Sequence, residues 1–336
     1  RVLRPLFPKG YYNDTQIISS VISSDDENDG DVLGGIGASL ALHLSDIPFD
    51  GPMGEVRVGR IDGEFVINPT VTELQSSDID MVVGGTRDSV LMIEGEMEEI
   101  SEEEMLAAIK AAHSAIVTLC DFQDELREEL GKEKREFTPV EANSDILTHV
   151  KELAEAAMVE VIGIGLGKEE YNAKIKDIKE SALASLIEEE KDDEYISEAK
   201  KILGQIEKEQ LRSMILTQKR RIDGRSPVDI RDIWTQVGYI PRTHGSSIFT
   251  RGETQALVSV TLGTKRDEQS VDTLFSQEGK KFMLHYNFPP YSVGEAGFMR
   301  GPGRREIGHG HLAERGLSHL LPTREEFPYT IRVVSE

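Results

Sequence analysis

The feature that most constrains the fold is a proline-free, strongly helical block that interrupts two segments of mixed character. From about residue 144 to 220 the chain is dominated by Lys, Glu, Ala, Leu and Ile, and apolar residues such as Ile202 and Ile206 recur at spacings of three and four. That spacing places them on one face of a helix. We therefore expect three domains, at residues 1–134, 140–218 and 219–336.

The flanking segments combine strand-like and helical patterns. In the first segment, short β-branched runs surround a small-residue helix at 34–44 and a longer helix at about 102–130. The longer helix is expected to begin at Ser101, because the serine hydroxyl and the carboxylate of Glu104 can cap each other's backbone donors. In the last segment, residues 255–261 alternate as a strand does. Strands and helices in both flanks predict an α+β fold class with a central all-α domain.

A glycine-rich run, Gly163 to Lys168, lies inside the helical block. A phosphate-binding P-loop requires Ser or Thr after its lysine, and Glu169 stands there instead. The run is therefore interpreted as a link between two helices.

Charge and cysteine usage restrict the partners and the compartment. The formal net charge is −23, so any nucleic-acid contact must be local rather than a basic coat. The single cysteine, Cys120, excludes an intrachain disulfide, and it is expected to be a core residue. With no long apolar run and no signal-like start, the sequence predicts a cytoplasmic protein with no membrane contact.

The two ends of the chain share a short pattern. Residues 1–8 and 315–322 have Arg, two Leu and Pro in common without a gap, at an offset of 314 positions that also aligns Ile17 with Ile331. We interpret this as an internal repeat of two incomplete copies separated by the helical block. If so, Ile17 and Ile331 should lie in equivalent elements.

The residues best suited to catalysis lie near the C-terminal end of the chain. Arg304 and Arg305 are adjacent guanidiniums beside glycines, and His309 and His311 follow within a few residues. Guanidiniums match phosphate oxygens in bidentate fashion, and glycine lets the backbone approach closely. A zinc site at the two histidines is disfavoured, because no other histidine or cysteine has ligand spacing. The pattern indicates phosphodiester chemistry.

Several runs closely resemble the polynucleotide phosphorylase (polyribonucleotide nucleotidyltransferase) family. They cover about residues 1–125 and 219–336, whereas the helical block matches mainly in place and character. The runs are Arg4–Pro8, Gly37–Leu42, Ile47–Pro52, Asn68–Thr70, Pro241–Leu257, His285–Glu295 and Arg304–Gly310.

This resemblance implies two partial RNase PH-like domains, built of βαβ units packed with helices and joined by the all-α domain. It implies a homotrimer that binds single-stranded RNA, with RNA-degradosome components as possible partners. The implied activity is 3′-to-5′ phosphorolysis in mRNA degradation, in which inorganic phosphate as co-substrate and Mg²⁺ as cofactor release nucleoside diphosphates. The magnesium carboxylates are expected beyond Glu336, so the 336 residues alone are expected to be inactive.

The resemblance also assigns roles to residues. Arg304, Arg305 and His309 fall on catalytic positions of the second copy, with His309 either donating a proton or binding substrate. In the same copy, RNA or phosphate binding, or a trimer contact, is implied for Arg242, His244 and Arg251, while Tyr286, Phe288 and Tyr291 suit loop packing better than base stacking.

The first copy departs from the family pattern. Asn28-Asp29-Gly30-Asp31 stands where the family has a Gly-Ser-Ser-Ser phosphate cradle, and of the metal-binding positions only Asp80 is retained. Because carboxylates repel phosphate, the first copy is expected to be architectural. Two other readings stay open, a tRNA-trimming relative and an inactive RNA-binding ring subunit.

Overall fold

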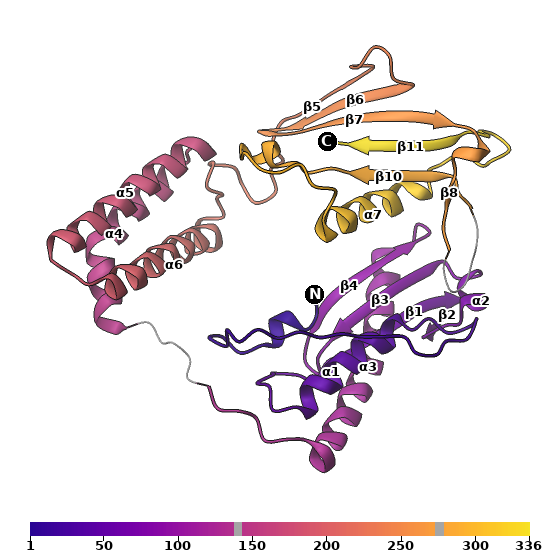
Figure 1. The fold of residues 1–336 in the computed structure, drawn as a ribbon, viewed down its shortest axis with the longest axis horizontal. Coiled ribbons are helices and arrows are strands. Elements are labelled where there is room, and N and C mark those ends of the chain that lie inside the picture. The colour runs from indigo at the N-terminus through magenta and orange to yellow at the C-terminus, as the bar shows by residue number, and fades with distance from the viewer. Residues whose placement is uncertain (138–142, 273–278) are drawn as a thin grey trace. The chain divides into compact units, whose positions relative to one another are not determined.

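The computed structural model describes residues 1–137, 143–272 and 279–336. The chain forms two compact units, one made of residues 1–138 and 233–336 and the other of residues 139–232. The first unit contains two segments of strands and helices, and the second is helical (Figure 1). Residues 219–232, which the sequence placed in the third domain, belong to the helical unit.

The first segment builds a four-stranded antiparallel sheet in the order β2-β1-β3-β4. Its strands are β1 (Gly54–Ile61), β2 (Glu64–Ile67), β3 (Ile79–Gly85) and β4 (Val90–Met97). Its helices are η1 (Arg4–Leu6), α1 (Asp31–Leu44), α2 (Val71–Leu74) and α3 (Glu102–Leu130). The predicted capping box at Ser101 and Glu104 is present at the start of α3.

The core of this segment lies between α3 and the sheet. Ala108, Ala112, Ile116 and Cys120 recur every fourth residue and are buried against strand residues such as Met81. By length and composition alone α3 could cross a membrane. Its packed face and the three glutamates of its first turn instead identify a core helix.

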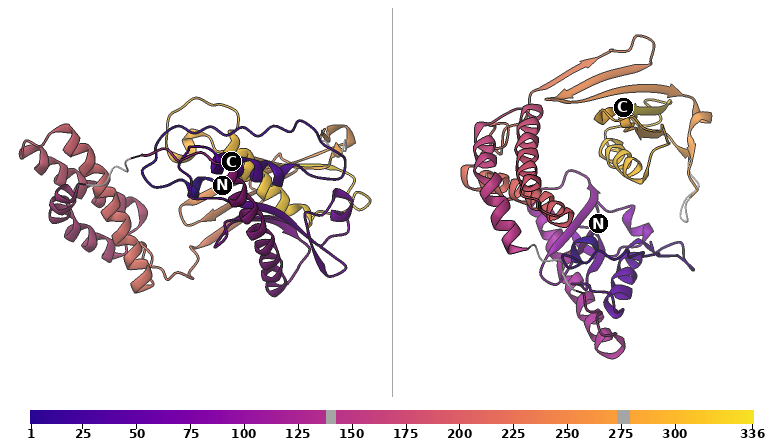
Figure 2. Two further views of the ribbon diagram at one scale, coloured as in Figure 1. Left: turned by 90° about the horizontal axis from the view of Figure 1, so that it is seen from below. Right: turned by 60° about the vertical axis from the view of Figure 1, so that its left-hand side comes forward.

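The helical unit packs three helices side by side (Figures 1 and 2). They are α4 (Ser144–Ile164), α5 (Lys168–Glu188) and α6 (Asp193–Gln218). The glycine-rich run links α4 to α5, and Gly165 adopts the left-handed conformation at φ 88° that glycine tolerates best. Arg220 donates to the carbonyl of Gly163, and Ile222 packs on the helical core. These contacts explain why the residues after α6 belong to this unit.

The last segment builds a five-stranded mixed sheet in the order β10-β11-β7-β6-β5. Its main strands are β5 (Ile233–Val237), β6 (Gly245–Arg251), β7 (Thr254–Gly263), β10 (Phe282–Tyr286) and β11 (Thr330–Ser335). The remaining elements are η2 (Lys265–Asp267), β8 (Gln269–Ser270), β9 (Gly279–Lys280), η3 (Pro290–Val293) and α7 (Arg304–Ser318). Because β10 and β11 are parallel, α7 is the crossover helix of a βαβ unit.

The two chain ends that the repeat aligns do not form equivalent elements of secondary structure. Ile331 lies in β11, between β10 and β7, whereas Ile17 lies in an extended stretch outside any strand. A strand requires a ladder of hydrogen bonds to a neighbour, and in the described part of the chain residues 11–30 pair with no strand. The structure therefore contradicts the prediction that Ile17 and Ile331 lie in equivalent elements.

Candidate active site

The first turn of α7 stands at the carboxyl end of the parallel pair β10 and β11. The helix runs back along β10: Glu306 and Asn287 line one hollow, while Glu314, later in the helix, reaches the amide of Leu284. In βαβ units the carboxyl ends of parallel strands are where ligands usually bind. The fold therefore presents the start of α7 at an edge suited to substrate.

The three predicted catalytic residues lie together on the first turns of this helix. Arg304 and Arg305 occupy its first two positions and His309 follows about one turn later, and all three side chains are exposed. The ring of His309 lies 5.6 Å from that of Tyr286, which stacks on Phe288 at 6.2 Å. Tyr286 thus packs beside a predicted catalytic residue, a relation that sequence reasoning did not find.

This arrangement favours an anion. The helix begins after Gly303, whose residue type supplies no side-chain cap, so backbone N–H groups of the first turn remain available. Those groups carry the positive end of the helix dipole, and Arg304 and Arg305 add two permanent charges. Within the described residues neither guanidinium has an ion-pair partner.

The residues predicted to bind RNA or phosphate do not form one cluster. The imidazole Nδ1 of His244 accepts a hydrogen bond from the backbone N–H of Leu262 at 2.8 Å, which anchors the turn before β6. Arg251 ends β6, and seven residues at about 3.3 Å each separate it from His244 by roughly 20 Å. Arg242 lies with His244 at the start of that strand.

Strand register relates these residues to α7. Through Ile331 of β11, Leu262 is level with Phe282, the first residue of β10. Because His244 accepts a hydrogen bond from Leu262, His244 and the nearby Arg242 lie toward the amino end of β10. Arg251 lies beyond the opposite end, the same edge as the start of α7. Only Arg251 can therefore extend the surface formed by α7.

Among the residues that the structure describes, no group of three His, Cys, Asp or Glu side chains could hold a metal ion. His311 lies 3.8 Å from Glu314 and has no further ligand-type neighbour in that set. The surface at α7 is thus cationic.

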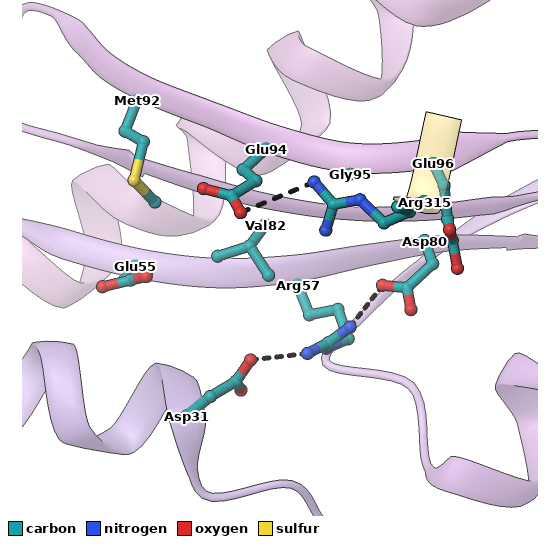
Figure 3. A pocket seen from close by; sticks show the side chains of 10 residues that line it. All are labelled: Asp31, Glu55, Arg57, Asp80, Val82, Met92, Glu94, Gly95, Glu96 and Arg315. Carbon is teal, nitrogen blue, oxygen red and sulfur yellow. Dashed lines mark hydrogen bonds and ion pairs between the residues drawn. The ribbon is translucent and has the colours of Figure 1, made fainter. Parts of the chain in front are cut away.

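A second cavity, of about 240 Å³, is lined mainly by carboxylates of the first segment, with Arg315 of α7 lying 3.5 Å from Glu94 (Figure 3). Arg57, on β1, forms ion pairs with Asp31 and Asp80 and lies 3.5 Å from Asp29. Asp31 opens α1, and Asp80 lies on β3. Further carboxylates line the cavity at Glu55, Glu94 and Glu96.

The two acidic residues that replace the phosphate cradle are therefore engaged with a cation. Burial opposes the charge of Arg57, but Asp80 and Asp31 outweigh it, so the pKa of the guanidinium is raised. Burial and the neighbouring Asp31 raise the pKa of Glu55. Sequence reasoning missed Arg57; the only available signal was a charged residue alternating with two buried valines along a strand.

Three family models match successive parts of the chain. Residues 51–115 match "3' exoribonuclease family, domain 2". Residues 145–226 match "Polyribonucleotide nucleotidyltransferase, RNA binding domain", and residues 229–336 match "3' exoribonuclease family, domain 1". The order places a second domain of one copy before the first domain of another.

Curated relatives match along the whole chain. A polyribonucleotide nucleotidyltransferase of Chlorobium phaeobacteroides (strain BS1) is 53% identical over 351 residues, and one of Chlorobaculum parvum is 52% identical over 350. In both comparisons all of this chain aligns with 48% of the relative. The chain thus spans about half the length of the curated relatives it matches.

Proposed function

The chain belongs to the polyribonucleotide nucleotidyltransferase family, and we propose that it forms part of a phosphorolytic 3′-to-5′ exoribonuclease that acts in mRNA degradation. The observation that carries this proposal is the exposed pair Arg304 and Arg305 on the first turn of α7, at the carboxyl edge of β10 and β11. The family match supplies the reaction, and the geometry supports where these residues would act.

In the proposed reaction, an oxygen of inorganic phosphate forms a bond to the phosphorus of the last internucleotide linkage. The bond from that phosphorus to the 3′ oxygen of the preceding nucleotide breaks, and the 3′ oxygen takes a proton. A nucleoside diphosphate leaves. Both reactants are anions, so Arg304 and Arg305 would offset their repulsion and stabilise charge on the transferring group. His309 would donate the proton or hold the substrate.

We assign no magnesium ligand among the described residues. Of the positions that would bind metal in the first copy only Asp80 remains, and it is paired with Arg57. Near α7 the described carboxylates form no group of three. The family implies Mg²⁺, but no step through the metal is assigned to these residues.

We propose one role for each part of the chain. The first segment, 1–134, is an architectural copy; the helical part, 140–218, contributes to RNA binding; and the last segment, 219–336, carries half of an active site. The 336 residues by themselves are proposed to be inactive. The proposed assembly is a cytoplasmic homotrimer on single-stranded RNA, with degradosome proteins as further partners and no membrane contact.

The decisive experiment uses the full-length protein with single-stranded RNA. Adding inorganic phosphate should release nucleoside diphosphates from the 3′ end, and omitting it should stop their release. Release of nucleoside monophosphates without phosphate would contradict phosphorolysis. Binding of RNA with no turnover would favour an inactive ring subunit.

A further inference from the structure

We infer that Glu314, in the second half of α7, is a positioning residue that fixes this helix against β10 through the amide of Leu284 and against the end of β9 through Lys280, and thereby places Arg304 and Arg305. The inference rests on the proposed function. Arg304 and Glu314 are ten residues apart, about 15 Å along a helix. Glu314 therefore cannot touch a substrate held at the start of α7.

The open edge of β10 explains why a carboxylate is needed there. β10 is the outermost strand of its sheet, so every second backbone N–H points away from β11. The N–H of Leu284 is one of these, and it donates to the Glu314 carboxylate at 3.3 Å. α7 runs alongside this edge (Figure 1) and covers it.

Gly310 brings the helix close enough for this contact. One turn before Glu314, a Cβ added at Gly310 would lie 3.4 Å from the Leu284 carbonyl oxygen and from two atoms of Tyr286. There is room for little more than a methyl group at this point. The helix backbone thus rests against the strand edge beside the tyrosine whose ring neighbours His309.

The second oxygen of Glu314 is paired with a cation. Lys280, the last residue of β9, lies 2.7 Å from Glu314 Oε2. The side chain of Glu314 is only 11% exposed, so water does little to stabilise its charge. A carboxylate this buried is retained only with its partners, so one side chain joins α7 to both the end of β9 and the middle of β10.

The connection to function is geometric. α7 meets Leu284 and Tyr286 of β10 and Lys280 at the end of β9, and a shift of the helix along β10 would move both arginines with it. A misplacement of about 1 Å can cost about a hundredfold in rate. Glu314 therefore governs catalysis without taking part in it.

A charge exchange in the full-length protein tests the inference. Glu314→Lys and Lys280→Glu should each lower kcat for RNA phosphorolysis about tenfold, with KM for phosphate changed less than about threefold. The double variant, which restores an opposite-charge pair, should return kcat to within about threefold of the parent. Glu325→Lys makes the same charge change at an exposed residue beyond α7 and should leave kcat unchanged.

Two further measurements separate positioning from simple loss of fold. Thermal unfolding reports whether each variant is folded at the assay temperature, and amide hydrogen exchange reports protection of residues 304–312 without requiring activity. Parental kcat in both single variants, or a folded double variant that stays tenfold impaired, overturns the inference. If exchange in α7 depends on the charge pair but the parent releases no nucleoside diphosphate, the proposed function fails and the positioning role stands.

Discussion

Two arginine environments distinguish the first segment from the last. The side chain of Arg57 is 15% exposed and is held by Asp31 and Asp80. Arg304 and Arg305 are exposed at the start of α7 and have no ion-pair partner within the described residues. A guanidinium paired with carboxylates has little charge left to attract phosphate, whereas a free one keeps its full charge.

If the proposed function holds, the partner carboxylates, rather than the arginine itself, decide whether an arginine has a structural or a catalytic role. In the first segment, Asp29 and Asp31 put negative charge where the family places its phosphate cradle, and Arg57 makes that charge tolerable inside the fold. In the last segment, Arg304 and Arg305 form no ion pair with any described residue, although Glu306 stands in the same turn of α7.

Removing either free arginine should abolish most of the activity. In the full-length protein, Arg304→Ala or Arg305→Ala should raise the transition-state barrier by about 3 kcal/mol, roughly a hundredfold in kcat, because a preorganised charge partner is lost. RNA affinity should change much less, since the rest of the RNA-binding surface is intact. Steady-state release of nucleoside diphosphates and a binding isotherm check the two halves of this statement.

The lysine variants at the same positions provide the matched control. Arg304→Lys and Arg305→Lys retain charge but not the planar fork, so they should recover only part of the lost rate. Full recovery would show that charge alone suffices there.

Removing the paired arginine should affect stability instead. Arg57→Ala leaves three carboxylates near one another without their cation and should lower the free energy of unfolding by about 2 kcal/mol, less than for a fully buried pair because the aspartates are partly exposed. Urea unfolding measures the change, and Arg266→Ala, at an exposed arginine, should change it by less than about 0.5 kcal/mol. If the two variants proved equally stable, the carboxylate cavity would not depend on Arg57.

Local features of the fold were predictable from sequence, whereas the paired site was not. α3 begins at Ser101 because the capping residues are three positions apart, and sequence shows such spacing directly. The stretch around Ile17 has the composition of a strand, but a strand also needs a neighbour that sequence does not identify. Arg57 was missed for the same reason, since Asp31 and Asp80 are 26 and 23 residues away from it.

The candidate-site residues also divide into a group that sequence could place together and a group that it could not. Arg304, Arg305 and His309 are close in sequence and share one helix, so a motif was enough to group them. His244 and Arg251 are also near one another in sequence, yet a strand separates them, because extended chain carries residues apart where a helix keeps them together.

The buried carboxylate beside the paired arginine predicts a modest pH effect. Burial and Asp31 raise the pKa of Glu55 above the usual 4.5. As pH rises through that value, the unfolded chain loses its proton first, so the stability contributed by Glu55 falls with increasing pH until the folded group also ionises. At pH 7, Glu55→Gln should stabilise the fold by up to about 1 kcal/mol, with partial exposure to water limiting the gain.

Comparing unfolding at pH 4 and pH 7 checks this effect. The stabilisation by Glu55→Gln should be present at pH 7 and much smaller at pH 4, where the carboxyl group is mostly protonated in both states. Glu64→Gln, at an exposed position on the neighbouring strand β2, should give no such difference. An equal gain at both pH values would show that the effect arises from packing rather than charge.

The two aspartates that replace the phosphate cradle should contribute little to turnover. Asp29→Asn with Asp31→Asn removes two carboxylates that we assign no substrate, and Arg57 keeps its ion pair with Asp80. Turnover of the full-length enzyme should therefore stay within about twofold when measured well below its unfolding temperature, even though some stability is lost. The reverse pattern, a collapse of turnover here and near-normal rates after Arg304→Ala, would place the chemistry in the first segment. The free arginines of α7 would then be structural, and exposure of a guanidinium would no longer distinguish a catalytic site from an architectural one.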